Sequence, residues 1–361
     1  MDIKYLAALN TFPKFGPVRT KKLKVYFPSW QAAFNANSSE LMQAGIDEKI
    51  ALEFSLHRKN INPDELMENI YRENIKLVAQ NDPAYPSLLK EIPDPPALLY
   101  LRGELKEEDK YSVAIVGSRK FSTYGRQATD DIVKELAGGR IVIVSGLALG
   151  IDAISHIATV KSNGRTIGVL GSGVDKESIY PVANRNLAEK IIGSGGAIIS
   201  EFPLGTKAMP FYFPQRNRII AGLTRGTLVI EAAEKSGALI TARFALDFNR
   251  EVFAVPGSIY SPVSVGTNEL IKQGALLVRS GSEIIEALDL NRVSLYIKAK
   301  SAVPETKEEE ILLSFLGKEA AHINDLIRLS NLTASVVSST LTLMEMKGMI
   351  KNLGGMEYVL I

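Results

Sequence analysis

Seven short apolar runs between residues 112 and 289 constrain the fold of this chain more than any other feature. Each run has four or five residues, and amphipathic stretches separate the runs. Strands that alternate with helices predict a parallel sheet with helices on both faces. Runs that are apolar at nearly every position are typical of strands buried on both sides. The expected strands are Ser112–Val116, Ile141–Ser145, Thr166–Leu170, Ala197–Ser200, Thr227–Ile230, Val252–Val255 and Ala275–Val278.

Helical patterns flank this α/β core on both sides. Residues 1–80 carry helical patterning and no strong strand pattern, and the proline-rich segment 81–111 is interpreted as a linker with one or two short strands that leads into the core. The core is predicted to span residues 112–290, and a second linker is predicted over 291–306. Residues 307–361 have the order helix, helix, helix, hairpin, which is typical of a winged helix. Its expected elements are Glu308–Leu316, Ile323–Ser330, Ala334–Lys347 and a hairpin over Met349–Ile361.

The composition is that of a globular protein. At roughly 150 residues per domain, 361 residues predict two or three domains. Hydrophobic residues make up 46% of the chain and charged residues 23%, which excludes disorder as its general state. Lys and Arg total 42 against 40 Asp and Glu, so a nucleic-acid site has to come from local clustering of positive charge.

The chain contains no cysteine, which excludes disulfides, cysteine-based zinc sites, iron–sulfur clusters and thiol nucleophiles. This composition suits a reducing cytosol, and we expect a cytoplasmic protein. The first twelve residues lack the apolar run of a signal peptide. No stretch approaches 18 uncharged apolar residues, so we expect no membrane span.

Glycine and small polar residues gather where the expected strands end. In an open parallel sheet, ligands bind beyond the carboxyl ends of the strands. Glycine lets a ligand approach the backbone closely, and the free N–H groups of the following helices favour anions. These turns together predict a phosphate-binding site, while the alternative is that the glycines only make tight turns. The residues are Gly117, Ser118, Gly146, Gly171, Ser236 and Gly237.

The sequence argues against two common phosphate ligands. A dinucleotide fingerprint needs a third glycine, but residue 176 after Gly171-Ser172-Gly173 is lysine. No Walker-type loop is present either. Several separated basic groups suit a polyanion better than one small ester, because Arg binds phosphate through two N–H groups and Lys acts as a point charge. The basic groups expected near the edge are Arg119, Lys120, Arg216, Arg218, Lys235 and Arg243.

Three consecutive aromatic residues, Phe211, Tyr212 and Phe213, stand directly before Arg216-Asn217-Arg218. Aromatic residues interleaved with basic ones favour single-stranded nucleic acid, whose bases stack on side-chain rings. The alternative is a core aromatic run beside solvated arginines.

Taken together, these residues resemble the DNA-processing protein A family, also called Smf. The resemblance covers roughly residues 80–290, with the motifs in the order of the family. The motifs are Gly117-Ser118-Arg119, Ser145-Gly146 with Ala148 and Gly150-Ile151-Asp152, Tyr180-Pro181, Ser200-Glu201, Phe213-Pro214 with Arg216-Asn217-Arg218-Ile219-Ile220, Glu231-Ala232 with Lys235-Ser236-Gly237, Pro256-Gly257-Ser258, and Gly266-Thr267-Asn268 with Leu270-Ile271.

The resemblance implies a protein of natural transformation that protects incoming single-stranded DNA in the cytosol, forms dimers and loads the RecA recombinase onto that DNA. It implies an extended Rossmann-like core that is not known as an enzyme, and no cofactor. By position in the family motifs, Arg119 and Lys235 would be the main phosphate contacts. Arg216, Asn217 and Arg218 would line the same pocket, with Gly117, Ser118 and Gly237 offering their backbone.

Three positions depart from the family pattern. Position 149 is Leu where the family commonly has Arg, position 215 is Gln where Arg is frequent, and position 238 is Ala where Ser is frequent. Each change removes a polar contact from the pocket, so we expect weaker affinity with the same mode of binding.

A basic segment near the start of the chain predicts additional DNA contacts. Its turn places Gly16 between hydrophobic residues before a basic helix, as in a helix-hairpin-helix, where backbone N–H groups reach a DNA phosphate. The alternative is a solvated basic face. The resemblance implies a domain here that is similar to the sterile alpha motif and suits DNA or protein contact. The basic residues are Lys14, Arg19, Lys21, Lys22 and Lys24.

The C-terminal region is a weaker candidate for DNA binding. Residues 307–361 hold five basic and seven acidic residues, and the third helix carries a cation only at its end, at Lys347. A DNA reader needs Arg or Lys facing phosphates. Protein contact or a structural role is therefore favoured.

Catalytic and metal-binding alternatives have less support in the sequence. Glu201 and Glu231 end neighbouring strands and could act as acid and base, but capping turns or orienting arginines suits them better. A nucleoside-monophosphate phosphoribohydrolase of similar fold is the alternative function, although its Gly-Gly-x-Gly-Thr loop is missing. Asp152 and His156 share a helix face without an evident third ligand, so no metal site is predicted. A protein-binding adaptor would leave the basic pocket without a purpose.

Overall fold

The computed structural model describes residues 2–290, 306–316, 320–346 and 349–360. These residues form two compact units, one up to Leu288 and one from Asp289 onward. The expected linker 291–306 falls outside the described residues except for Thr306, and so does Lys347.

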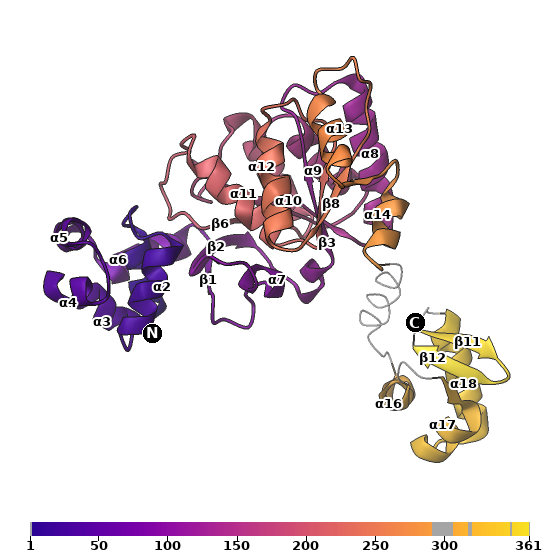
Figure 1. Ribbon diagram of the computed structural model, residues 1–361. Coiled ribbons are helices and arrows are strands. Elements are labelled where there is room, and N and C mark those ends of the chain that lie inside the picture. Colours follow the sequence, from indigo (N-terminus) through magenta and orange to yellow (C-terminus); the bar gives the residue numbers. More distant parts are fainter. Residues whose placement is uncertain (1, 291–305, 317–319, 347–348, 361) are drawn as a thin grey trace. The chain divides into compact units, whose positions relative to one another are not determined.

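A nine-stranded sheet is the centre of the first unit within the described residues. Figure 1 shows the sheet among the helices that cover it. Its strand order is β1-β2-β6-β5-β4-β3-β7-β8-β9. The strands are β1 (Lys76–Ala79), β2 (Leu98–Gly103), β3 (Ser112–Val116), β4 (Val142–Ser145), β5 (Thr166–Val169), β6 (Ala197–Ser200), β7 (Gly226–Val229), β8 (Glu251–Ala254) and β9 (Leu276–Leu277).

Every strand expected from an apolar run is present, with its ends within one residue of the expected ones. From β6 to β9 neighbouring strands run parallel, as the alternation with helices predicts. The parallel part is buried from both sides: all five residues of β3 and all four of β4 are buried. The prediction of an α/β core is therefore confirmed.

One edge of the sheet differs from the expectation. Strand β2 is antiparallel to β6, and β1 is antiparallel to β2 with Val78 opposite Leu99. The prediction of helical patterning without a strong strand pattern over residues 1–80 therefore missed β1. Its four residues are too short to show a strand period, and pairing with a strand some twenty residues later decides their conformation.

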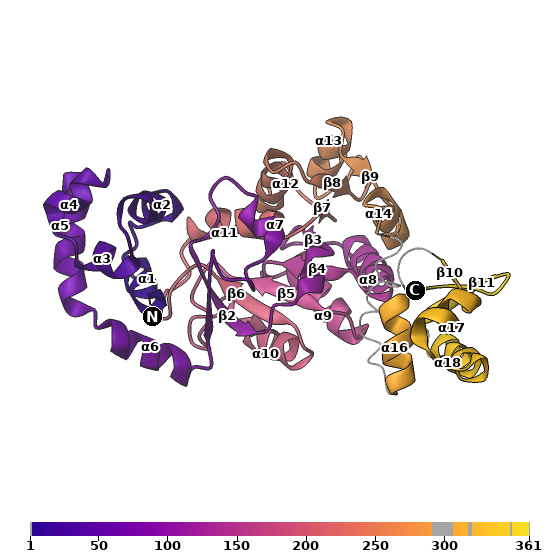
Figure 2. The same cartoon turned by 90° about the horizontal axis from the view of Figure 1, so that it is seen from below.

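Two layers of helices cover the sheet (Figure 2). One layer holds α7, α11 and α12, whose buried residues share one apolar cluster with the sheet, and the other holds α8, α9 and α10. Serine side chains cap the N-termini of two of these helices. The hydroxyl oxygen of Ser122 accepts from the N–H of Gly125, and that of Ser236 accepts from the N–H of Ala238. The helices of this region are α7 (Ser87–Lys90), α8 (Thr123–Gly138), α9 (Ile151–Lys161), α10 (Arg185–Gly193), α11 (Tyr212–Gly222), α12 (Gly237–Asp247), α13 (Val265–Lys272) and α14 (Gly281–Ala287), with 3₁₀ turns at Glu107–Lys110 and Val182–Asn184.

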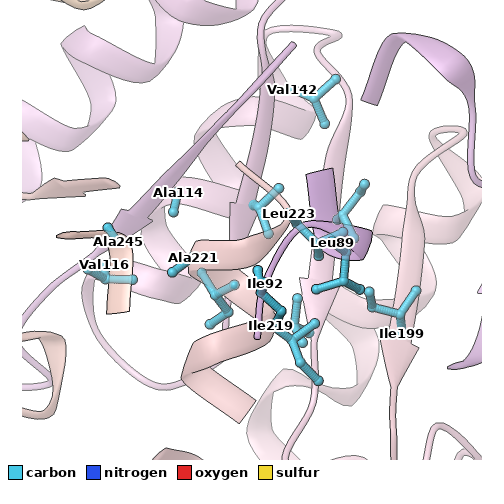
Figure 3. Packing of buried hydrophobic residues seen from close by; sticks show 14 of the residues in the cluster. Leu89, Ile92, Ala114, Val116, Val142, Ile199, Ile219, Ala221, Leu223 and Ala245 are labelled. Carbon is cyan, nitrogen blue, oxygen red and sulfur yellow. The ribbon is translucent and has the colours of Figure 1, made fainter. Parts of the chain in front are cut away.

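The cluster under α7 and α11 fixes these helices against the sheet (Figure 3). Leu89 and Ile92, in and just after α7, lie close to Ile219 of α11, and the same cluster includes Val142 and Ile199 of the sheet. Burial of such side chains contributes about 1.5–3 kcal/mol each relative to exposure. The position of α11 matters because the expected site residues Arg216, Asn217 and Arg218 lie on it.

The N-terminal helices belong to the same compact unit as the sheet. Leu6 and Ala7 of the first helix and Ile70 of the sixth pack against Leu98 and Tyr100 of β2. A separate aromatic cluster fills the interior of the helical part, where Phe12, Phe15 and Phe54 are buried together. The helices are α1 (Ile3–Asn10), α2 (Pro17–Tyr26), α3 (Trp30–Asn35), α4 (Ser38–Gln43), α5 (Glu48–His57) and α6 (Pro63–Arg72), with a 3₁₀ turn at Arg58–Asn60.

The second unit is a winged helix, as the order of its elements predicts. A two-residue strand that the sequence pattern did not indicate, β10, joins the C-terminal hairpin in a small sheet of order β10-β12-β11. Leu312, Leu326, Val337 and Leu341 belong to the hydrophobic core of this second unit. None of the helices in the described part of the chain combines the length and apolar character that a bilayer crossing requires. The elements are α16 (Lys307–Phe315), β10 (Ala321–His322), α17 (Ile323–Ser330), α18 (Ala334–Met346), β11 (Ile350–Gly354) and β12 (Glu357–Leu360).

Candidate phosphate-binding cleft

The strand order reverses at β3, and this reversal creates a crevice. The chain runs outward from β3 through β4 and β5 to β6, and then returns to β7 on the other side of β3. Strands β3 and β7 are neighbours in the sheet, but the helices that follow them lie in opposite layers, α8 after β3 and α12 after β7. A crevice therefore opens between the turns at their carboxyl ends, where open α/β sheets bind their ligands.

A cleft of about 760 Å³ lies at this point. The turns after β3 and β7 supply much of its polar wall, and α11 supplies another side. The lining residues are Val116, Gly117, Ser118, Arg119, Lys120, Ala148, Asp152, Tyr180, Pro210, Phe213, Pro214, Arg216, Asn217, Ile220, Ala233, Lys235, Ser236, Gly237, Ala238, Ile240, Thr241 and Val263.

Close backbone packing shapes the turn after β3. The N–H of Ser118 donates to the carbonyl oxygen of Glu231 at 2.8 Å, which joins this turn to the end of β7. The carbonyl oxygen of Ser118 accepts from Ile151 at the start of α9. Gly150, at a φ of +85°, passes so close that a Cβ there would lie 2.3 Å from this oxygen. The glycine is required for the approach of the two turns.

Arg119, Lys120 and Lys235 are exposed on the wall of the cleft. The guanidinium of Arg119 lies over the ring of Phe213, 5.6 Å from its centroid. Within the described residues, none of these three cations has an ion-pair partner. Their charges are therefore available to a ligand.

The start of α12 completes the wall beside Lys235. Ser236 caps this eleven-residue helix, and Ser236, Gly237 and Ala238 at its start line the cleft. The positive end of the helix dipole at this point favours an anion. Asn217 holds this end in place, since its Nδ2 donates to the carbonyl oxygen of Gly237 at 3.3 Å. The Oδ1 of Asn217 accepts from Nε of Arg216 at 3.2 Å.

Arg216 lies at the bottom of the cleft and is only 4% exposed. Its Nη1 donates to the carbonyl oxygens of Gly146 and Val169. Burial lowers the pKa of Arg216 to about 10. The charge of Arg119 also lowers this pKa, while the nearby carboxyl of Asp152 acts in the opposite direction and raises it. Burial likewise raises the pKa of Asp152, against the opposing effects of Arg216 and of the N–H of Gly146 at 3.1 Å. Arg216 therefore gives the cleft a positive floor while part of its guanidinium is held by the backbone.

Arg218 occupies a different place from the one expected. It is largely buried and donates from Nη2 to the carboxylate of Glu201, outside the lining of the cleft. Residues 216 and 218 of α11 lie about 200° apart around the helix, so only one of them can face the cleft. The structure thus places Arg218 in a buried ion pair, while Glu201 orients an arginine as the sequence suggested.

Two expected glycines also lie outside the lining of the cleft. A Cβ on Gly146 would lie 2.5 Å from Nη1 of Arg216, so this glycine makes room for the guanidinium. Gly171 packs against the ring of Phe213 and the backbone of Tyr212. Both act on the cleft through the side chains that rest on them. Of the departures from the family pattern, Leu149 is exposed beside the cleft and Ala238 is part of its lining.

Aromatic residues form one rim of the cleft. Phe213 and Tyr180 both line it, with ring centroids 5.8 Å apart, and Tyr180 is 48% exposed. Tyr212 lies outside the lining and contacts Phe202, with ring centroids 4.2 Å apart and the ring planes tilted by 43°. The sequence pattern did not assign Tyr180 to the site, because about thirty residues separate it from Phe213 and only the fold brings the rings together.

The other acidic candidate, Glu231, serves the fold. It is buried, and its carboxylate accepts from the N–H of Ser122 at 2.9 Å and from the hydroxyl of the same residue. His156 is also buried, and its Nδ1 lies 2.7 Å from the hydroxyl oxygen of Thr166. Among the described residues, no group of three or more potential ligands could hold a metal ion.

The basic segment of the N-terminal helices is partly neutralised. Lys14 pairs with Glu53, and Nη2 of Arg19 lies 3.3 Å from a carboxylate oxygen of Asp47. Nζ of Lys22 donates to the carbonyl oxygen of Gly45 at 2.8 Å. Lys21 is exposed, and Gly16 lies open at the N-terminus of α2. None of the five expected contacts in this segment lines the cleft; they are Lys14, Gly16, Arg19, Lys21 and Lys22.

We predict that Arg218→Met lowers the free energy of unfolding by about 3–5 kcal/mol, because it leaves the buried carboxylate of Glu201 without its partner. Urea denaturation followed by circular dichroism measures this loss. The double variant Arg218→Met/Glu201→Leu should regain most of it, since no buried charge is left. A loss below about 1 kcal/mol in the single variant would show that the pair is solvated.

Family models match most of the chain. The model of DNA recombination-mediator protein A matches residues 76–289, which include the whole sheet and the cleft. The model of the DprA winged helix domain matches residues 298–356.

Curated relatives and solved structures agree with these matches. Protein Smf of Synechocystis sp. is 34% identical over 98% of each chain, and DNA processing protein DprA of Bacillus subtilis is 44% identical over 60% of this chain and 73% of its own. The crystal structure of DNA processing protein A from Streptococcus pneumoniae matches with a TM-score of 0.68 and 33% identity, over 78% of this chain and 97% of that one. The protein of the same name from Helicobacter pylori, whose structure is described with its single-stranded DNA binding mode, matches with a TM-score of 0.53 and 31% identity, over 59% and 95%.

Proposed function

This chain belongs to the DNA recombination-mediator protein A family, and from that premise we propose that it binds single-stranded DNA in the cleft between the turns after β3 and β7. One observation carries the proposal: Arg119 and Lys235 line the same cleft at the strand reversal, exposed and without an ion-pair partner among the described residues. Two unneutralised cations beside a helix N-terminus attract a phosphate group.

The aromatic rim favours single strands over duplex DNA. The cleft has the volume of a small-ligand pocket, so it admits a nucleotide unit and not a whole duplex. Tyr180 and Phe213 offer ring faces beside the cations, and only an unpaired base can turn toward such a face. The Helicobacter pylori protein, at 31% identity, adds support, because single-stranded DNA binding is described for it.

The proposed roles of the lining residues differ. Arg119, Lys120 and Lys235 bind the backbone phosphates, while Gly117, Ser118, Ser236 and Gly237 bring main-chain groups close to them. Arg216 provides the positive floor, and Asn217 aligns it with α12. This division follows from exposure, since a buried guanidinium bonded to carbonyl oxygens has few donors left for a ligand.

The alternative function, hydrolysis of nucleoside monophosphates, finds less support in this geometry. Glu231, the candidate acid or base, is engaged by Ser122 at the start of α8 and is absent from the lining of the cleft. We propose a protein that binds DNA without a catalytic step or a cofactor.

We predict that the double variant Arg119→Ala/Lys235→Ala reduces the slope of log K against log salt concentration by about 1.4, since each phosphate contact on a single strand contributes about 0.7. Fluorescence anisotropy with a labelled oligothymidine across a salt series measures the slope. The matched control is Lys161→Ala/Lys190→Ala, which removes two exposed charges at the far ends of α9 and α10. An unchanged slope in the first variant would remove these two residues from the site.

The N-terminal basic residues enter the proposal as secondary contacts. Lys21 and Lys22 are exposed on α2 near the open turn at Gly16, whereas Lys14 and Arg19 are engaged by carboxylates. We expect Lys21→Ala/Lys22→Ala to weaken duplex binding about twofold or more at low salt and to leave single-strand binding at the cleft intact. Equal affinities of variant and wild type for both kinds of DNA would show that this face is only solvated.

In the cell we propose that this protein acts in the cytosol, during natural transformation, as a dimer that protects incoming single strands and loads the RecA recombinase onto them. Filament assembly by the recombinase from the same organism, on strands already covered by a single-strand-binding protein, tests this role. The protein should shorten the lag before assembly, and Arg119→Ala/Lys235→Ala should not. An unaltered lag with wild-type protein would contradict the loading role, and a monomer in sedimentation would contradict the dimer.

A further inference from the structure

Three exposed aromatic side chains lie beside the cleft and are absent from its lining. Phe121 is 39% exposed, Tyr124 is 51% exposed and Tyr260 is 89% exposed. We call these three residues the aromatic strip. An isolated exposed ring is common on a soluble domain, but three rings that adjoin the cations of one cleft offer stacking faces to a strand bound there.

The strip continues directly from the cations of the cleft. Phe121 follows Arg119 and Lys120 in the same turn, and Tyr124 lies in the first turn of α8. The hydroxyl of Tyr124 donates to the carbonyl oxygen of Pro256 at 2.8 Å. This bond ties the start of α8 to the loop that carries Tyr260.

The loop after β8 returns to the cleft beyond Tyr260. Val263 lines the cleft, and its carbonyl oxygen accepts from the N–H of Ala232 at 2.7 Å. Tyr260 therefore stands on a loop with one end bonded to Tyr124 of the strip and the other in the cleft wall. Neither the loop from Pro256 to Ser264 nor the turn from Gly117 to Tyr124 contains an acidic residue that would repel a phosphate backbone.

Hydrogen bonds hold this loop in one conformation. Asn268 of α13 makes two bonds with the backbone of Gly257, at 3.2 and 3.0 Å. The N–H of Tyr260 donates to the hydroxyl of Ser258 at 3.2 Å, and the N–H of Ser261 donates to the carbonyl oxygen of Ser258 at 3.0 Å. An ordered loop presents a ring without a further ordering cost when a ligand binds.

We infer that a DNA strand leaving the cleft runs along the aromatic strip and that its bases stack on Tyr260 and its neighbours. The inference rests on the proposed function, because it assigns the path of the strand beyond the cleft. Stacking on a ring accepts every base, since each base has a π-face. The strip thus lengthens the site by nucleotides that contribute affinity without sequence preference.

Tyr260→Trp provides a direct probe. The chain has a single Trp, Trp30, which is partly buried between the N-terminal helices, so the wild-type protein supplies the background signal. Oligothymidines of increasing length are titrated into both proteins. Emission from residue 260 should be quenched by long oligonucleotides and not by those short enough to fill only the cleft. Absence of quenching at every length, with binding observed by anisotropy, would overturn the inference.

Tyr260→Ala supplies the affinity test. It should weaken the binding of long oligothymidines at least about fivefold, the low end of what one stacked base contributes, and leave the shortest ones unaffected. Its salt slope should equal that of the wild type, because no phosphate contact is lost. Tyr71→Ala is the matched control, since Tyr71 is 65% exposed on α6 and lies outside both the cleft and the strip.

The outcomes separate this inference from the proposed function. If the wild-type protein binds no single strand, the proposed function fails and the inference fails with it. If the wild type binds but Tyr260→Ala binds long strands equally well, only the inference fails. Weaker self-association of Tyr260→Ala with unchanged DNA affinity would likewise overturn it, by assigning the strip to contact between copies of the chain. Because Tyr260 is almost fully exposed, neither variant at this position removes buried packing.

Discussion

The reversal of strand order at β3 is the constraint on which the cleft depends. Strands β4 and β7 flank β3, and the turns that follow β3 and β7 lead to helices in opposite layers. These two turns therefore move apart at the carboxyl ends of the strands. The crevice is thus a consequence of topology. The side chains of the turns then decide its chemistry, with cations at Arg119 and Lys235 and a capped helix end at Ser236.

Burial sorts the positive charges of this region into two kinds. Arg216 and Arg218 are bonded to carbonyl oxygens and to Glu201 and hold the floor and the flank of the cleft together. Arg119 and Lys235 remain exposed and give the cleft its attraction for phosphate. The two arginines of the sequence Arg-Asn-Arg on α11 therefore serve mainly to build the cleft, while the charge that we propose for ligand binding comes from the two turns across the strand reversal.

The sequence predicts most of the core because buried parallel strands are apolar at every position and glycine-rich turns mark their ends. It fails where long-range pairing decides the conformation, as in β1, whose four residues carry no strand period. It also cannot show which face of α11 turns inward, so Arg218 was expected beside Arg216. Tyr180 and Tyr260 were not assigned to the site, although Tyr180-Pro181 is one of the family motifs, because each becomes part of the rim or the strip only when distant segments meet.

A crystal structure of the protein with a short oligothymidine tests the central claim most directly. We expect a backbone phosphate within hydrogen-bond distance of Arg119 and Lys235 at the N-terminus of α12, with an unpaired base against Tyr180 or Phe213. A strand bound on another surface, with the cleft empty, would contradict it.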